Sequence, residues 1–500
     1  MGAQASSPAC SEKCGRMPAY TAKPESFAIT SVWGVFEMIT MKFGGTSVGD
    51  IERLRKITEI VRANGKRRPV VVVSAMPGVA DMLFSAAQSA LRKETAKVKE
   101  IIEELLLKHS QIAEALVTRP ERREKLLGFC AGLLEELDTI YHGIGWVEEL
   151  SPRSLDSVSS FGERLSAAQI AAVFEDAGIA AEYADARKLI RTDANFGQAA
   201  PDFAATRANI QKELAPLVEK NIVPVVTGCI AATKDGITTT LGRSGSDYTG
   251  IIVGAALGCE EIWICTDVDG LMTADPRHVG GARHLPEISW REAAEMAYFG
   301  TKVLHTNIMF PAIENNIPIR IKNSFNPSHP GTLISNETFG AAGAVKNVTS
   351  IDDLALLAVE GRGMMGVPGV ASRIFTALAR VGVSVMMISQ ASSEHSVCLV
   401  IPGKDQPRAV EALREEFAED MAGKMIDDVR LRENVAIIAV VGEGMRGVPG
   451  VAGKTFMAAA RENVNIIAVA QGSSELNISL VVDQGDVRRA VQAIHDAFIS

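Results

Sequence analysis

Short apolar, β-branched runs alternate with amphipathic helical patterns over the first two thirds of the chain. The runs at residues 70–73, 223–226, 262–264 and 317–321 are almost free of polar residues. Strands of a parallel sheet have this composition because helices cover both of its faces. Residues 166–177 have the apolar spacing of a helix. The pattern predicts an α/β domain over residues 38–335, with a mostly parallel central sheet flanked by helices.

A charged stretch within this domain, residues 91–141, has apolar positions at helical spacing among many Lys and Glu residues. It predicts a helical hairpin that decorates the substrate side of the domain. Ligands of such sheets bind beyond the carboxyl ends of the strands. The segments 74–78, 227–228 and 266–267 each follow a predicted strand, and they are therefore candidate ligand contacts.

The rest of the chain contains an internal repeat. Residues 361–400 and 442–481 align without gaps at an offset of 81 residues, with 20 identities in 40 positions. Each unit predicts a strand, a glycine-rich turn, a helix, two strands and a helix, which in the first unit are expected at residues 354–359, 366–369, 370–380, 383–389, 396–401 and 409–417. Two small α+β sandwiches, at residues 346–433 and 434–500, are expected to pack side by side. A duplicated dimerisation module without a ligand is the alternative.

Composition narrows the functional classes. A net charge of −9 and a pI near 5.6 argue against a nucleic-acid or anionic-membrane surface. No run of about 18 apolar residues is present, so no membrane span is expected. The seven cysteines are an odd number spread over a long chain. They predict reduced thiols and a cytoplasmic location rather than a disulfide framework.

The first 37 residues are rich in Ser, Ala and Pro and lack periodicity. We expect a disordered or non-native extension, with Met38 or Met41 as the working start. An N-myristoylation pattern at Met1-Gly2 carries less weight. So does a transit peptide, because the segment contains several acidic residues.

The most informative motif lies where the first predicted strand meets a helix, at residues 42–47, with the sequence Lys-Phe-Gly-Gly-Thr-Ser. Apolar residues at 35–39 predict the strand, and Asp50 is the expected N-cap of the helix. Glycines at such a turn let backbone N–H groups approach an oxyanion, and a lysine suits a transferring phosphoryl group. Alone, the pattern also fits an ordinary strand–helix connection.

Four further segments follow in order: residues 161–166, expected to open a helix; residues 238–248, a glycine- and hydroxyl-rich loop; residues 266–277, which begin at a strand end; and residues 299–305, before a helix. In this order, and with the repeat behind them, the motifs resemble those of the aspartate kinases. These are members of the amino-acid kinase superfamily with tandem C-terminal ACT domains of the ferredoxin-like type. The resemblance covers about residues 38–500 and is to the threonine-sensitive kinases. Since the sequence ends after the second repeat, the resemblance implies the monofunctional arrangement.

This resemblance implies ATP-dependent phosphorylation of the side-chain carboxylate of L-aspartate to 4-phospho-L-aspartate. That reaction is the first step towards lysine, threonine, methionine and isoleucine. Two anions meet in it, so the protein must supply positioning and charge cancellation. Lys42 is expected over the transferring phosphoryl group, with N–H groups near Gly44 and Gly45 completing the cradle. Arg243 is suited to grip the substrate carboxylate, and Glu163 to hold the α-amino group.

The other site positions are implied by the resemblance. Ser74, Ser246 and Asp247 complete the substrate side, and Asp247 could also orient Lys42 or help to hold Mg²⁺. The residues that match the family's ATP-binding positions are Thr266, Asp267, Met272, Arg277 and Lys302. No protein metal site is expected, because the ATP phosphates would carry the Mg²⁺.

Several positions depart from the family pattern. Ala80 lacks a hydroxyl expected at the aspartate site, and Cys229 replaces a phenylalanine. Ser244 replaces a glycine and adds a Cβ to a crowded loop, while Met272 replaces an aromatic residue and still offers adenine an apolar face. The charged residues of the family pattern are retained, so we expect this chain to catalyse the same type of reaction. The four substitutions are expected to affect its substrate preference or rate.

Gln390 and Gln471, at equivalent positions of the repeat, match the glutamines that carry the threonine response of the family. The stretch 383–387 has no acid to pair with a lysine ammonium, so threonine is favoured as the effector. Shared ACT sheets imply a homodimer, or a tetramer. Two alternatives stay open: a kinase of another acidic amino acid, and a non-catalytic amino-acid sensor on a degenerate kinase scaffold.

Overall fold

The computed structural model describes residues 37–299, 306–337 and 343–499. The expected N-terminal extension, up to residue 36, lies outside the described residues, and so does Lys302. No described helix is both long and apolar enough to cross a bilayer.

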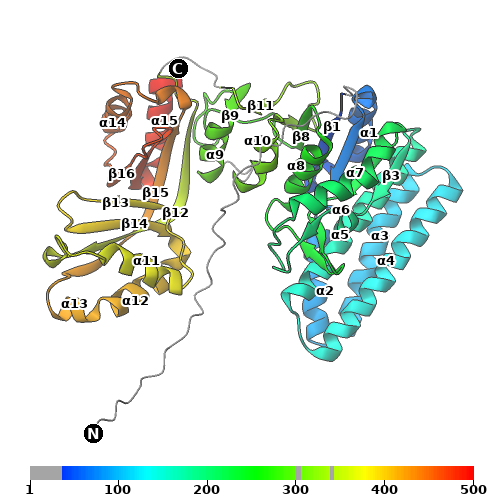
Figure 1. Cartoon of the computed structure of the whole chain (residues 1–500), viewed down its shortest axis with the longest axis horizontal. Helices are drawn as coiled ribbons and strands as arrows, with labels where there is room; N and C mark the ends of the chain where they lie inside the picture. The colour runs from blue at the N-terminus through cyan, green and yellow to red at the C-terminus, as the bar shows by residue number, and fades with distance from the viewer. Residues whose placement is uncertain (1–36, 300–305, 338–342, 500) are drawn as a thin grey trace, which may run out of the picture. The chain divides into compact units, whose positions relative to one another are not determined.

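An eight-stranded sheet forms the centre of the first part of the chain (Figure 1). Its neighbouring strands run parallel except at the β10–β11 pair, which confirms the predicted sheet. In spatial order the strands are β3 (Ala181–Ala184), β5 (Val223–Thr227), β2 (Pro69–Val73), β1 (Ile39–Phe43), β8 (Glu261–Thr266), β10 (Ile319–Asn323), β11 (Thr332–Ser335) and β9 (Glu287–Ser289). A separate small sheet contains β4 (Arg191–Thr192), β6 (Ile230–Thr233) and β7 (Thr238–Thr240).

Helices cover both faces of this sheet, which is why the central strand β2 is fully apolar. Val71 and Val73 of β2 pack into one core, and Val70 and Val72 pack into a second core on the other face. The first core is closed by α1 (Ile51–Ala63), α2 (Val79–Leu91), α3 (Thr95–Leu116), α4 (Pro120–Val147) and α5 (Pro152–Asp176). The second is closed by α6 (Ala186–Leu189), α7 (Phe203–Glu219) and α8 (Gly245–Leu257), while α9 (Trp290–Tyr298) and α10 (Phe310–Glu314) pack near β8 and β10.

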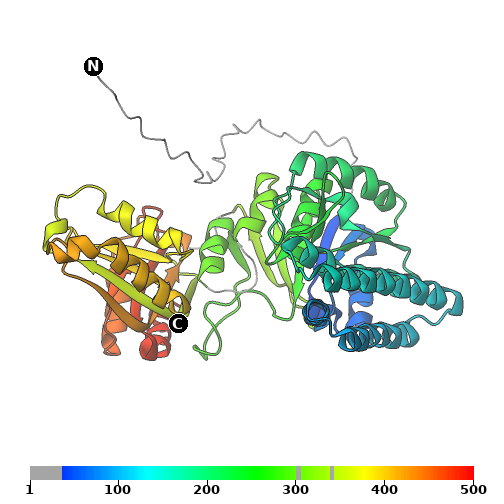
Figure 2. The ribbon, with the colours of Figure 1, turned by 90° about the horizontal axis from the view of Figure 1, so that it is seen from below.

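The predicted helical hairpin is present as α3 and α4, which run side by side (Figures 1 and 2). Asp50 caps α1 as expected, since its carboxylate accepts from the N–H of Arg53 at 2.9 Å.

Three local expectations were wrong. Lys42 lies inside β1 rather than after it. Residues 161–166 lie within α5, which already begins at Pro152, and Gly162 is needed there because a Cβ would lie 2.8 Å from the Cβ of Ala75. Residues 238–240 form a strand and Gly245 begins α8, so the expected loop shrinks to residues 241–244.

The repeat forms one antiparallel sheet of six strands, in the order β13-β14-β12-β15-β17-β16. Residues 354–360 of β12 pair with residues 428–435 of β15 in the first unit, and residues 347–351 pair with residues 437–441 in the second. The two units therefore lie side by side, as predicted, and share their two long strands. The strands are β12 (Asn347–Glu360), β13 (Met387–Gln390), β14 (Ser396–Pro402), β15 (Asp428–Val441), β16 (Ala468–Ala470) and β17 (Asn477–Asp483).

The helices of the repeat are α11 (Val370–Arg380), α12 (Gln406–Glu416), α13 (Ala418–Ala422), α14 (Val451–Arg461) and α15 (Val487–Ile499). The two helices predicted for each unit are present, and the short α13 of the first unit is an additional helix that the sequence pattern did not predict. The strand expected at residues 383–389 is shorter than predicted, because β13 starts only at Met387.

Candidate active site

A buried ion pair joins the first strand to a helix that follows it much later in the sequence. The Lys42 Nζ lies 2.6 Å from Asp247 Oδ1, and both residues are buried. Lys42 points from β1 towards α8, where a Cβ on Gly250 would lie 3.0 Å from the Lys42 Cβ. Among the described residues no other donor reaches this oxygen of Asp247. The pair therefore places a buried ammonium beside a carboxylate near the carboxyl end of β1.

Glycines fix the start of α8 against the turn that follows β5. A Cβ on Gly228 would lie 2.7 Å from the Ser246 Cβ, and a Cβ on Gly245 would lie 2.5 Å from the Cys229 Sγ. Only hydrogen fits at either place, so Ser246 and Asp247 are held in the first turn of α8. An acid in this position is also stabilised by the helix dipole.

In the glycine turn after β1, the N–H of Gly44 has a partner within the protein, whereas the sequence suggested that it would face a ligand. The N–H of Gly44 donates to the carbonyl of Cys265 at 3.3 Å, so it ties the turn to β8 and is not free for a phosphate. Gly45 begins a short 3₁₀ helix (Gly45–Val48), and a Cβ there would lie 3.1 Å from the carbonyl of Ala75. A Cβ on Gly44 would lie 3.4 Å from the Lys42 Nζ, which is an ordinary van der Waals contact. The nucleotide cradle expected at Gly44 and Gly45 stays a prediction, with the N–H of Gly44 already used within the protein.

Glu163 reaches the same region from α5. Desolvation raises the pKa of its carboxyl to about 7, although the N–H of Ala75 donates to it. Ser74 directly precedes Ala75, and its N–H donates to the carbonyl of Phe43 at 3.2 Å. Desolvation raises the pKa of the half-buried Cys229 thiol to about 12; the nearby Glu163 carboxylate raises this pKa further, and the Lys42 ammonium lowers it. The structure thus brings Lys42, Ser74, Glu163, Ser246 and Asp247 to one edge of the sheet, as expected.

Arg243 and Ser244 form the turn before α8, and both are exposed. Arg243 has no ion-pair or hydrogen-bond partner within the described ranges, so its guanidinium is available to a ligand carboxylate. Ser244 has a φ of +54°, a left-handed conformation that glycine adopts without strain. The family's glycine here is explained by the backbone rather than by crowding, since the Ser244 side chain is exposed.

The expected nucleotide residues follow β8. The Thr266 hydroxyl donates to Asp267 Oδ1 at 3.1 Å, and the Asp267 side chain is exposed. Met272 is half-buried, and its carbonyl accepts from Asn347 at 2.9 Å. Arg277 is exposed and forms a bidentate pair with Asp275. These residues lie along one chain segment, but no contact joins Arg277 to the Lys42–Asp247 pair within the described structure.

A pair of serines that the sequence did not single out joins the two halves of this site. The hydroxyls of Ser47 and Ser324 lie 2.8 Å apart, and Ser324 also donates to the carbonyl of Thr266 at 3.0 Å. Beside them, Asn323 and Asn326 donate to Asp269, which holds the pKa of that carboxyl below its usual range. The only sequence signal was that Ser324 follows a predicted strand.

Comparison with known proteins fits this geometry. The amino acid kinase family matches residues 37–323, and an ACT domain family matches residues 357–417 and 438–498. The chain belongs to the amino acid kinase family. A bifunctional aspartokinase/homoserine dehydrogenase 1 of Arabidopsis thaliana is 39% identical over 467 residues, which are 91% of this chain and 50% of the relative. Aspartokinase 3 of the same plant is 34% identical over 462 residues, which are 92% of this chain and 81% of the relative.

This amino acid kinase therefore spans about half the length of the first relatives it matches. Among solved structures, that of Escherichia coli aspartokinase III with aspartate and ADP is 30% identical in sequence and has a TM-score of 0.73. The structural match covers 93% of this chain and 100% of the E. coli chain. The aspartate kinase of Clostridium acetobutylicum is 26% identical with a TM-score of 0.76, and the match covers 92% of this chain and 99% of that one. The kinase fold and the tandem ACT domains are confirmed.

Each ACT unit of this kinase carries the same turn contact. The N–H of Gly366 donates to Glu394 at 2.8 Å, and the N–H of Gly447 donates to Glu475 at 2.5 Å. In the first unit a cavity of about 260 Å³ lies at this turn, and Gln390 lines it. Gln471 occupies the equivalent, exposed position after β16.

The helix α9 connects the kinase to both ACT units. The Tyr298 hydroxyl donates to the carbonyl of Met386 at 2.8 Å, next to β13, and Glu292 accepts from the N–H of Glu443 at 2.9 Å after β15. The buried Thr349 hydroxyl donates to the carbonyl of Phe299 at 3.0 Å. The strand β12 of the ACT sheet therefore contacts Phe299, which lies three residues before Lys302 in the sequence.

Proposed function

We propose that this kinase transfers the γ-phosphoryl group of ATP to the side-chain carboxylate of L-aspartate and forms 4-phospho-L-aspartate. The buried Lys42–Asp247 pair is the observation that carries the proposal. An ammonium held at 2.6 Å by a carboxylate cannot swing away, and it cancels charge as two anions approach. The aspartate and ADP bound to the E. coli neighbour support the same substrates.

The remaining residues divide the substrate between them. Glu163 accepts from the α-amino group, Arg243 takes a substrate carboxylate, and the hydroxyls of Ser74 and Ser246 complete that side. The side-chain carboxylate of the substrate aspartate then points to Lys42, and the Lys42 ammonium stabilises the phosphoryl group as it moves from ATP to that carboxylate. Because Glu163 is desolvated, its carboxylate gains most from a cationic partner, so the substrate ammonium favours its ionised form.

The nucleotide lies on the other side of Lys42. Thr266, Asp267, the apolar face of Met272, Arg277 and Lys302 are assigned to ATP. No group of three or more His, Cys, Asp or Glu residues able to hold a metal occurs in the described ranges. The buried oxygen of Asp247 and the exposed Asp267 carboxylate fit a Mg²⁺ ion carried by the phosphates. Such an ion bridges phosphate oxygens and neutralises their charge.

The decisive experiment measures aspartyl hydroxamate formed with ATP, Mg²⁺ and L-aspartate. We expect turnover in the parent, and a loss of at least about 10³-fold in Lys42→Ala, because a fixed charge at the transferring group is removed. Lys56→Ala, at a half-exposed lysine of α1, is the matched control and should retain parental turnover.

Two outcomes would redirect the assignment. Hydroxamate from glutamate but not aspartate would mean that Ala80, exposed in the first turn of α2, and Cys229 have changed the substrate pocket. No product from any acid, in a folded parent, would support the amino-acid sensor instead.

Feedback inhibition is the second part of the proposal. Threonine, an end product of the pathway that 4-phosphoaspartate enters, binds at the ACT turns through Gln390 and Gln471 and favours a less active state. The absence of an acid at residues 383–387 supports threonine over lysine, although a lysine complex is known for the E. coli neighbour. Gln390→Ala and Gln471→Ala should weaken inhibition by threonine. We further propose ACT-mediated homodimers or tetramers and a cytoplasmic location.

A further inference from the structure

A buried aspartate of α5 binds the strand that leads into the Arg243 turn. Asp156 is 3% exposed, and it lies seven residues before Glu163, so both residues are on the same face of this helix. The Asp156 Oδ1 accepts from the Thr240 hydroxyl at 2.7 Å. Its Oδ2 accepts from the N–H of Thr240 at 3.0 Å and from the N–H of Gly197 at 2.9 Å. Three donors therefore converge on one carboxylate that solvent barely reaches.

The residues that Asp156 binds hold the Arg243 turn from two sides. Thr240 is the last residue of β7, and the turn begins directly after it. Gly197 flanks the turn, because a Cβ on Gly242 would lie 3.0 Å from the Gly197 carbonyl oxygen. Since the Arg243 side chain is exposed, the backbone around it decides where its guanidinium can reach.

We propose that Asp156 is a positioning residue for the amino-acid substrate, which sets the place of Arg243 relative to Glu163. The inference rests on the proposed function, in which Glu163 holds the substrate amino group and Arg243 holds a substrate carboxylate. A substrate held at both ends needs the two protein groups at a fixed spacing. An error of about 1 Å in such positioning costs on the order of 100-fold in rate.

The test is steady-state formation of aspartyl hydroxamate by the full chain, with L-aspartate and ATP varied separately. Asp156→Ala removes all three hydrogen bonds and releases the start and the flank of the turn. We expect the KM for aspartate to rise at least about tenfold, with the KM for ATP within about twofold of the parental value, because Asp156 contacts no residue assigned to ATP.

A conservative variant separates hydrogen bonding from charge. In Asp156→Asn the amide oxygen can accept from both N–H groups, and the amide NH₂ can donate to the Thr240 hydroxyl, which is also an acceptor. This variant should keep the KM for aspartate within about threefold of the parent. A KM as high as that of Asp156→Ala would show that the charge matters, and it would overturn positioning through hydrogen bonds.

A milder pair of variants keeps the test decisive if Asp156→Ala fails to fold. Thr240→Val removes only the hydroxyl contact and should raise the KM for aspartate about threefold. Thr240→Ser keeps the hydroxyl and should retain the parental KM. Equal KM values for aspartate in these two variants would contradict the proposal.

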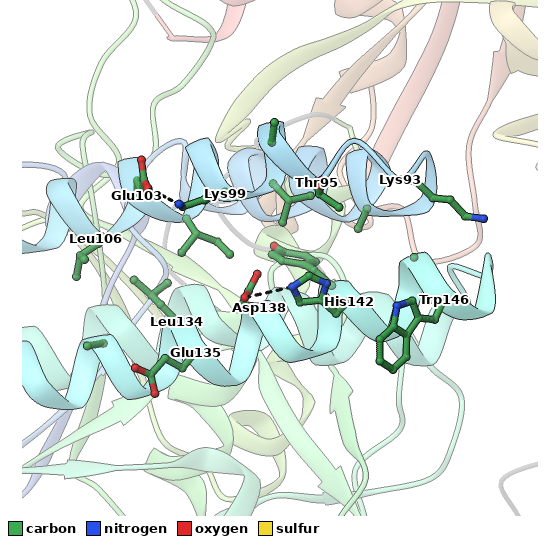
Figure 3. A pocket seen from close by; sticks show the side chains of 17 residues that line it. Lys93, Thr95, Lys99, Glu103, Leu106, Leu134, Glu135, Asp138, His142 and Trp146 are labelled. Carbon is green, nitrogen blue, oxygen red and sulfur yellow. Dashed lines mark ion pairs between the residues drawn. The ribbon is translucent and has the colours of Figure 1, made fainter.

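Two controls remove comparable contacts elsewhere. Asp138→Ala deletes a carboxylate of α4 that lines the cavity of about 900 Å³ between α3 and α4 and lies 3.5 Å from His142 (Figure 3). Ser151→Ala deletes the N-cap of α5, whose hydroxyl accepts from the N–H of Ser154 at 3.2 Å, without touching the Arg243 turn. Both controls should keep the parental KM values for aspartate and ATP.

A double variant tests whether Asp156 acts through Arg243. In an Arg243→Ala background, the further change Asp156→Ala should alter the KM for aspartate less than about twofold. A further tenfold rise there, equal rises in both KM values, or a folded Asp156→Ala variant with the parental KM would overturn this inference alone. A folded parent that forms no hydroxamate would overturn the proposed function, and this inference with it.

Discussion

At the scale of single residues, the Glu163 carboxyl gives the clearest link between burial and function. Its pKa of about 7 means that the ionised fraction falls about tenfold between pH 8 and pH 6. If this carboxylate holds the substrate ammonium, the KM for aspartate should rise about tenfold over that range. Glu163→Gln should have a high KM that no longer varies with pH, whereas Glu175→Gln, also on α5, should behave as the parent. Steady-state kinetics across pH would contradict the assignment if both variants kept the parental profile.

The same pKa predicts a change in stability. The folded pKa of Glu163 lies above its unfolded value, so the folded state binds more protons between about pH 4.5 and 7. Stability contributed by the protonated group is therefore lost as pH rises through this window. Glu163→Gln should have a higher urea midpoint than the parent at pH 8, and the difference should shrink towards pH 5. A constant difference between the two pH values would point to packing instead.

Ser244 illustrates a backbone cost that a side-chain comparison misses. Its φ of +54° is reached by glycine with little penalty, and its side chain is exposed. We expect Ser244→Gly to increase the free energy of unfolding by about 0.5–1 kcal/mol, measured by urea denaturation. Ser244→Ala keeps the Cβ and should bring no gain; an equal gain in both variants would rule out the conformational explanation.

At the scale of secondary-structure elements, the contact between α8 and the sheet positions Asp247. A Cβ on Gly254 would lie 2.5 Å from the Ile262 Cγ1, so Gly254→Ala must displace α8 or β8. We expect a loss of about 1–3 kcal/mol in unfolding free energy and a fall in turnover. Gly128→Ala, in an exposed part of α4 where a Cβ meets nothing within 4 Å, should instead gain up to about 1 kcal/mol from helix propensity. Equal effects of the two changes on stability would argue against tight packing at α8.

At the scale of the whole molecule, α9 is the element that both ACT units contact. Its end leads through Phe299, whose carbonyl is held by Thr349, to the segment that contains Lys302. We expect Thr349→Val to bind the effector as the parent does, by calorimetry, while effector inhibition weakens at least fivefold. Thr139→Val, on α4, is the control. Unchanged inhibition in Thr349→Val would mean that coupling takes another route.

Local patterns in the sequence were sufficient to predict the elements whose cause is local. Apolar runs at residues 70–73 and 223–226 became strands buried on both faces, because only such strands lack polar positions. Asp50 became a cap because its side chain satisfies an N–H three residues away. The repeat offset predicted two equivalent units, and the charged residues at strand ends marked one edge of the sheet as the candidate site.

The contacts between residues far apart in the sequence depend on tertiary packing. Lys42 pairs with Asp247, and Ser47 with Ser324 across 277 positions, through packing that no local pattern encodes. The length of α5, the use of the Gly44 N–H by Cys265, and the sharing of β12 and β15 between the ACT units depend on neighbours far along the chain. A propensity describes a residue and its near neighbours, whereas burial, pKa and ion pairing arise from what folding places around it.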